Sequence, residues 1–103
     1  MVTHHLRCDS VPFRDVIVGL KTYEIRKDDR GGGYATGDRL LLHEQGYLAP
    51  GDMQLSGCVA ECVVVHKLTG YGIEPGFCAL GIRVQRVYWP TDEDRPRHPG
   101  LQP

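Results

Sequence analysis

Lysine, glutamate and arginine side chains lie close together in one short segment, at Lys21, Glu24 and Arg26. Lysine and arginine donate hydrogen bonds to phosphates and carboxylates, whereas a glutamate accepts from an amine or takes part in proton transfer. One interpretation is a solvated ion pair between Lys21 and Glu24, which would contribute at most about 1 kcal/mol. The other is that the three charges converge on a polar ligand such as a nucleobase or a phosphate.

A short helix is expected just before these charges. Four apolar residues recur at helical spacing: Phe13, Val16, Ile17 and Leu20. Asp9 and Ser10 are residue types that favour the N-cap, and Gly19 can adopt the left-handed conformation that ends many helices. The pattern therefore predicts a helix over Val11–Val18.

A strand is predicted directly after this helix, at Thr22–Lys27. Apolar and polar residues alternate there, with Tyr23 and Ile25 on one face and Glu24 and Arg26 on the other. We expect the apolar pair to face the core. In that case Glu24 and Arg26 project together, away from the core.

The rest of the chain is dominated by strand patterns. Further strands are predicted at His4–Cys8, Arg39–Glu44, Leu55–Leu68 and Phe77–Tyr88. Connections are predicted at Asp28–Gly33, which we expect to be a flexible loop, and at Gly37–Asp38, Gln45–Gln54 and Thr69–Gly76. One helix and about five strands predict a small α+β barrel with the helix packed at its edge. Residues 1–89 are expected to form a single domain, followed by a disordered, proline-rich tail over residues 90–103.

The overall charge and hydropathy restrict the possible partners. The net charge of −1 at pH 7 provides no general attraction to nucleic acid or to a membrane, so a nucleic-acid site must be a local patch. No apolar run approaches the roughly 20 residues that span a bilayer, and no secretion signal is recognised. We expect a cytoplasmic monomer with no membrane partner.

The cysteines and histidines do not form a pattern typical of a metal site. The four cysteines are Cys8, Cys58, Cys62 and Cys78. Without an export signal they are expected to be reduced thiols, and Cys58 and Cys62 share one face of a predicted strand, as core residues would. His4 and His5 are adjacent in a predicted strand and point to opposite faces. No metal and no cofactor are expected.

The charged segment resembles the signature of a known family, the ASCH domain of the PUA-like superfamily. The resemblance rests on a Gly-x-Lys-x-x-Glu-x-Arg motif and a downstream Gly-Asp pair, present here as Gly19, Lys21, Glu24, Arg26, Gly37 and Asp38. It covers about His5 to Ile82 and is closest to a short branch found in phages and bacteria. It implies a PUA-like β-barrel that binds RNA or modified bases in a cleft beside the motif.

One branch of the ASCH family is enzymatic, and its resemblance to this chain is incomplete. That branch hydrolyses N-acetylated cytidine with a lysine, a nearby threonine and a distant glutamate. Lys21 matches the lysine, Glu24 stands at the threonine position, and Glu74 is a candidate for the distant glutamate. In such an amidohydrolase, backbone amides near Gly19 would receive the developing negative charge. A carboxylate near Lys21 would instead keep the lysine protonated and unable to act as a base.

Binding without turnover is therefore the preferred hypothesis. The resemblance and the residue types together nominate Arg7, Lys21, Glu24 and Arg26 as contacts to RNA or to a modified nucleotide. Arginine and lysine would bind phosphate, and Glu24 would accept a hydrogen bond from an exocyclic amine. Aromatic residues that could stack on a base are Tyr23, Tyr34 and Tyr71, although an aromatic residue in a small barrel is more often part of the core.

Two further alternatives would leave the cleft without a nucleic acid. Arg26 could brace the glycine loop through Asp28 or Asp29 instead of contacting a ligand. The protein could also be a protein–protein adaptor, whose working surface would be residues 90–103 or the Gln45–Gln54 connection.

Overall fold

The computed structural model describes residues 1–29, 33–49 and 52–91. This part of the chain contains five strands and one helix, in the order β1 (Thr3–Asp9), α1 (Ser10–Ile17), β2 (Tyr23–Lys27), β3 (Arg39–Ala49), β4 (Asp52–Leu68) and β5 (Phe77–Tyr88). None of the described helical residues forms a segment long and apolar enough to cross a membrane. Most of the predicted tail, and residues 30–32 of the predicted glycine loop, lie outside the described residues.

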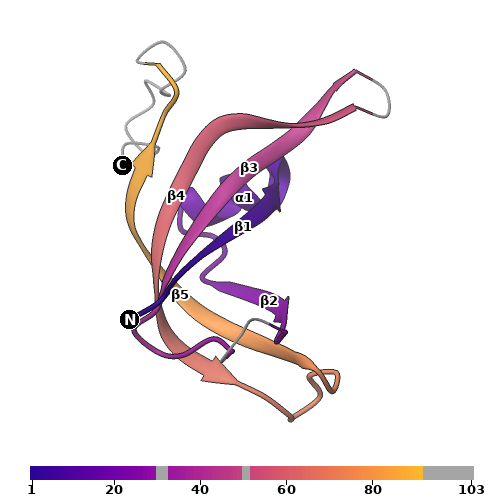
Figure 1. The fold of residues 1–103 in the computed structure, drawn as a ribbon, viewed down its shortest axis with the longest axis vertical. Helices are drawn as coiled ribbons and strands as arrows, with labels where there is room; N and C mark the ends of the chain where they lie inside the picture. Colours follow the sequence, from indigo (N-terminus) through magenta and orange to yellow (C-terminus); the bar gives the residue numbers. More distant parts are fainter. Residues whose placement is uncertain (30–32, 50–51, 92–103) are drawn as a thin grey trace.

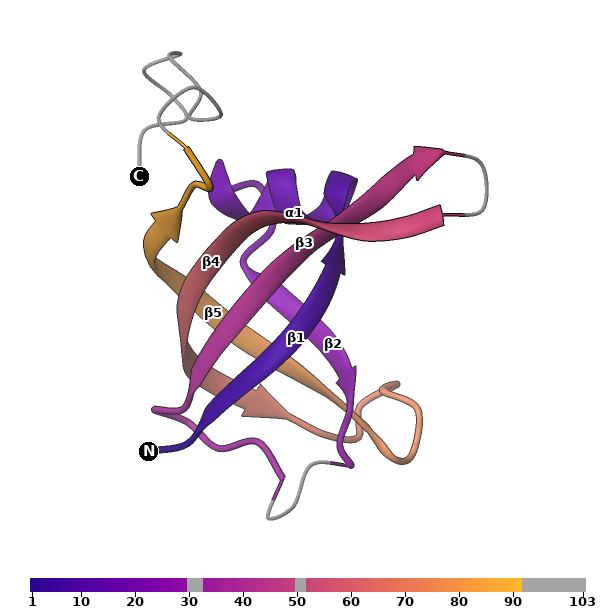
Figure 2. The ribbon, with the colours of Figure 1, turned by 45° about the horizontal axis from the view of Figure 1, so that its top comes forward.

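The strands form a single sheet that curls into a half-barrel (Figure 1). Their order in the sheet is β1-β3-β4-β5-β2, so β1 and β2 are the two edge strands. The β1–β3 pair is parallel, and the other three pairs are antiparallel. Helix α1 lies across one end of the curled sheet (Figure 2). The predicted α+β class, with a helix at the edge of a curved sheet, is confirmed at this level.

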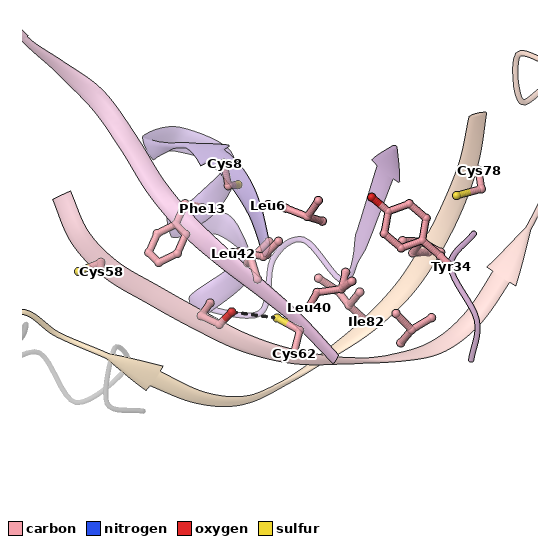
Figure 3. Close-up of a cluster of buried hydrophobic side chains, with 14 residues drawn as sticks. Leu6, Cys8, Phe13, Tyr34, Leu40, Leu42, Cys58, Cys62, Cys78 and Ile82 are labelled. Atoms are coloured by element: carbon pink, nitrogen blue, oxygen red, sulfur yellow. Dashed lines mark hydrogen bonds between the residues drawn. The ribbon is translucent and has the colours of Figure 1, made fainter. Parts of the chain in front are cut away.

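The core fills the concave side of the sheet. Residues of β1 alternate between exposed and buried, and Leu6 and Cys8 point inward. Phe13 of α1 is fully buried and packs among the strand side chains (Figure 3). The four cysteines are free and buried, and for Cys58 and Cys62 this burial was predicted from their shared strand face. Burial raises the pKa of the Cys62 thiol to about 12, so this thiol stays protonated.

Helix α1 ends at Ile17, one residue before the predicted end at Val18. Gly19 has a φ angle of +84°, in the left-handed region. Its N–H donates to the carbonyl of Val16, and the N–H groups of Leu20 and Lys21 both donate to the carbonyl of Asp15. This turn brings Lys21 to the start of β2. At the other end of the helix the side chain of Asp9 makes no capping bond, and its Oδ1 accepts from the Gln45 side chain.

Replacing Gly19 with alanine is expected to lower the free energy of unfolding by about 1 kcal/mol, because an L-residue is strained at this φ angle. A Cβ atom at this position would meet no other atom within 4 Å, so the change in unfolding free energy reports the backbone strain without a steric clash. Urea denaturation measures it. Leu20→Ala removes an exposed side chain in the same turn and should change the free energy by less than about 0.5 kcal/mol. Equal effects of the two substitutions would contradict this explanation.

The prediction of a long connection at Gln45–Gln54 is wrong. Strand β3 continues to Ala49 and β4 begins at Asp52, so most of this segment is paired backbone. The register shifts between His43 and Gln45 and again between Tyr47 and Ala49. Such irregularities interrupt the alternation of side chains while the ladder continues. Residues 50 and 51 of this predicted connection lie outside the described residues.

Candidate functional site

The structure brings Lys21, Glu24 and Arg26 together, and we call these three residues the Glu24 cluster. The Nζ atom of Lys21 lies 3.1 Å from Oε1 of Glu24, and the Nε atom of Arg26 lies 3.1 Å from Oε2. The Glu24 side chain is only 4% exposed, whereas those of Lys21 and Arg26 are 19% and 23% exposed. One buried carboxylate therefore holds two cations that still reach the surface.

The predicted orientation of β2 is wrong. Tyr23 and Ile25, which were expected to face the core, are 49% and 54% exposed, whereas Glu24 is buried on the concave side. A buried charge is tolerated when it is paired and hydrogen-bonded, and Glu24 has a cation at each oxygen. The ammonium of Lys21 also lies 5.4 Å from the centre of the Tyr23 ring. This contact places an exposed aromatic face beside the Glu24 cluster.

Arg26 connects the two edge strands of the sheet. Its Nη2 donates to the backbone carbonyl of Arg7 in β1 at 2.9 Å, while its Nε contacts Glu24. The Arg7 side chain itself is exposed and projects from the opposite face of β1 to Leu6. Arg7 thus contributes its backbone to the cluster, and its guanidinium lies on the outer surface.

In the described residues, Arg26 contacts Glu24 and Arg7, and not Asp28, one of the two aspartates through which it was expected to brace the glycine loop. The carboxylate of Asp28 is instead 3.0 Å from the Nζ of Lys67 and accepts from the N–H of Tyr34. The hydrogen bond from Lys67 lowers the pKa of Asp28, with burial acting in the opposite direction and the Tyr34 amide adding to the lowering. Lys67 also donates to the Tyr34 carbonyl at 2.8 Å.

Cys8 lies against the buried carboxylate. Its Sγ is 3.9 Å from Oε1 of Glu24. Burial and then the charge of Glu24 raise the pKa of the Cys8 thiol to about 11, although Lys21 and Arg26 act in the opposite direction. The thiol is therefore protonated at neutral pH and is not poised as a nucleophile.

An open cavity of about 430 Å³ lies next to Lys21, between the C-terminal end of α1 and β5. Its lining combines apolar side chains with two cations: Val16, Ile17, Val18, Gly19, Lys21, Thr22, Val65, Ile82, Arg83 and Val84. The size and the mostly apolar lining with a few polar groups are typical of small-molecule sites. Lys21 is the member of the Glu24 cluster that reaches this cavity.

Of the residues nominated for hydrolysis, Lys21 and Glu24 are in contact, whereas Glu74 lies apart from them. The backbone amides of Gly19, Leu20 and Lys21 donate to carbonyls within the helix end, so they do not point at a reacting oxygen. Glu74 is exposed in the β4–β5 connection. This connection leads into Phe77 and so lies beside the Lys27–Phe77 end of the β2–β5 pair. Lys21 comes just before Tyr23 and so lies beside the opposite, Tyr23–Gly81 end. Glu74 and Lys21 therefore lie beyond opposite ends of β2.

Sequence reasoning missed a buried hydrogen bond between the side chains of His4 and Asp38. The Nε2 atom of His4 lies 2.9 Å from Oδ2 of Asp38, and both side chains are about 5% exposed. Asp38 also accepts from the backbone amides of Val2 and Ala35. Burial would raise the pKa of Asp38, but these hydrogen bonds outweigh it and lower the pKa. The alternating pattern of β1 could have indicated that His4 is buried, because His4 shares its inward face with Leu6.

A second missed contact involves α1 and β3. The Nε atom of Arg14 lies 3.1 Å from Oε2 of buried Glu44, whose other oxygen accepts from Ser56 at 2.7 Å. This contact ties the helix to the sheet. No group of three or more histidine, cysteine, aspartate or glutamate side chains that could hold a metal ion occurs among the described residues.

Comparison with known protein families matches most of the chain to one family. Residues 3–82 match the model of a family described as a domain of unknown function, DUF3850. The match begins with β1 and extends into β5, so it includes the Glu24 cluster and Asp38. No curated protein matches the chain.

Proposed function

Because the chain belongs to the DUF3850 family, a domain of unknown function, we propose its function from its own site: it binds RNA or a nucleotide at the Glu24 cluster. The observation that carries this proposal is the buried carboxylate of Glu24 with two partly exposed cations on it. One carboxylate and two cations leave a local charge of +1 in a chain whose net charge is −1. In the proposal, the curled sheet is a PUA-like barrel of the ASCH type.

The donors of the cluster suit a phosphate group. Arginine has five N–H donors and a lysine ammonium has three, and each contact to Glu24 uses one of them. Glu24 limits the motion of both side chains, so a ligand loses less side-chain entropy when they bind it. Glu24 is thus an anchor for the cations, in place of the contact to a base amine that the sequence suggested.

Two neighbouring features could accommodate the rest of a nucleotide. Tyr23 offers a half-exposed ring beside Lys21, and bases stack on such rings in single-stranded nucleic-acid sites. The cavity next to Lys21 also has Arg83 in its lining. Arg7, exposed on the neighbouring edge strand, is a further cation that a strand of RNA crossing this edge would meet.

Arg26→Gln is expected to weaken binding of a short single-stranded RNA about tenfold, because it removes one charge-assisted contact to phosphate. Fluorescence anisotropy with a labelled oligonucleotide measures the affinity. For the wild type, affinity should fall steeply between 50 and 200 mM salt, and the slope should be smaller in the variant.

Arg86→Gln is the matched control, because Arg86 is an exposed arginine that contacts Tyr88 at the far end of β5. Its affinity for RNA should equal that of the wild type. Circular dichroism must show that Arg26→Gln is folded, since Arg26 also contacts Arg7. Absent binding, salt-independent binding, or equal losses in the two variants would overturn the proposal.

A further inference from the structure

Two histidines meet on the convex side of the sheet, away from the Glu24 cluster. His5 of β1 and His43 of β3 both point outward, between buried neighbours on their strands. The Nδ1 atom of His5 lies 3.0 Å from the Nε2 atom of His43. Their rings are stacked, with centroids 5.3 Å apart and an interplanar angle of 29°. A shallow pocket of about 230 Å³ is lined by these two residues with Leu6, Arg7 and Leu55.

We propose that His5 and His43 form a binding site for a divalent transition-metal ion that prefers tetragonal geometry, such as Cu²⁺ or Ni²⁺. The separation of the two nitrogens carries this choice. For metal–nitrogen bonds of about 2.0 Å, the separation of 3.0 Å corresponds to an angle of about 97° at the metal. This is closer to the right angle of a tetragonal ion, with nitrogens about 2.8 Å apart, than to a tetrahedral ion, with nitrogens about 3.3 Å apart. In the β1–β3 register, His5 is opposite Leu41 and His43 is opposite Arg7, so the two histidines lie two positions apart on one face of adjacent strands.

The protonation of the pair is compatible with binding. In the hydrogen-bonded pair, one of the two facing nitrogens carries a proton. On binding, that proton is replaced by a proton on the far nitrogen of the same ring, so both facing lone pairs bond to the metal. No electron is transferred, and no net proton is released from the neutral pair.

Two protein ligands leave the remaining metal positions to water or to another donor, so this is an open site with moderate affinity. Arg7 lines the same pocket, and its positive charge opposes a cation. The charge of Arg7 therefore distinguishes a bound cation from a bound anion in this pocket. Replacing Arg7 with glutamine should tighten metal binding, whereas it would weaken an anion held by the same three side chains.

Isothermal titration with NiCl₂ and CuCl₂ tests the site in a non-chelating buffer at pH 7.5. We expect one site per chain, a loss of at least tenfold in affinity in either His5→Gln or His43→Gln, and tighter binding in Arg7→Gln. His66→Gln is the matched control, because His66 is exposed on β4 of the same sheet. Histidine ¹⁵N shifts should identify Nδ1 of His5 and Nε2 of His43 as the nitrogens that respond.

Three results would overturn the proposal. The first is an affinity unchanged by both His5→Gln and His43→Gln, which would place any bound metal elsewhere. The second is Zn²⁺ binding tighter than Ni²⁺, which would contradict the right-angle geometry. The third is weaker metal binding in Arg7→Gln. Each histidine is at the surface of the sheet, so the variants are expected to fold, and circular dichroism checks this. The RNA assay is independent, so either proposal can fail alone.

Discussion

Replacing Glu24 with glutamine should lower the free energy of unfolding by roughly 3 kcal/mol, because removing one partner leaves charges unpaired at a buried site. Glutamine keeps the size of the side chain but lacks the charge that holds Lys21 and Arg26. Both cations are less than a quarter exposed, so water compensates for only part of the loss. Urea denaturation at pH 7 measures the effect. In the RNA assay the same variant should also bind more weakly, since the two cations lose their common anchor.

Glu74→Gln is the control for this substitution, because Glu74 is an exposed glutamate in the β4–β5 connection. Its change in unfolding free energy should stay within about 0.5 kcal/mol. A double variant that also carries Lys21→Gln separates the contributions, because contacting residues have non-additive effects. If Glu24→Gln proves as stable as Glu74→Gln, then Glu24 is not the anchor of the site, and the proposed arrangement of cations loses its physical basis.

The order of secondary-structure elements could be predicted from local patterns. The spacing of Phe13 and Val16 identified the helix, and the left-handed Gly19 marked its end. The last strand was predicted at Phe77–Tyr88, where the structure has it. These features depend on residues close together in the sequence. The extension of β3 to Ala49 could not be predicted in the same way, because backbone pairing across a long hairpin does not require alternating side chains.

The position of the Glu24 cluster could be predicted, but its orientation could not. Lys21, Glu24 and Arg26 are close in sequence, so their proximity follows from the turn after α1. The side of β2 that faces inward is decided by partners that the local sequence does not reveal. Glu24 is buried beside Cys8, which is 16 residues away, and Arg26 reaches the carbonyl of Arg7, 19 residues away. Hydrophobicity alone favoured Tyr23 and Ile25 as the inward pair.

The second large effect is expected at Asp38, whose carboxylate accepts hydrogen bonds from three groups. Oδ1 accepts from the Val2 amide, and Oδ2 accepts from His4 and from the Ala35 amide. Asparagine has one acceptor oxygen and an NH₂ group, so at least one buried donor would face another donor. Charge-assisted hydrogen bonds contribute about 1.5–3 kcal/mol each, and a buried unpaired donor costs about 1–3 kcal/mol. We therefore expect Asp38→Asn to lower the unfolding free energy by about 3 kcal/mol at pH 7.

The pH dependence identifies the charge of Asp38 as the cause. Its folded pKa lies below the ordinary value of 3.8, so its contribution is complete well above pH 4 and is lost as the pH falls through the folded pKa. The difference in unfolding free energy between wild type and Asp38→Asn should therefore shrink as the pH decreases from 6 to 3. Asp28, whose pKa is also lowered, is present in both proteins and cancels in that difference. Asp29→Asn, at an exposed aspartate, should show a small and nearly constant difference over this range. A difference for Asp38→Asn that does not change with pH would mean that the lost packing, and not the lost charge, destabilises the variant.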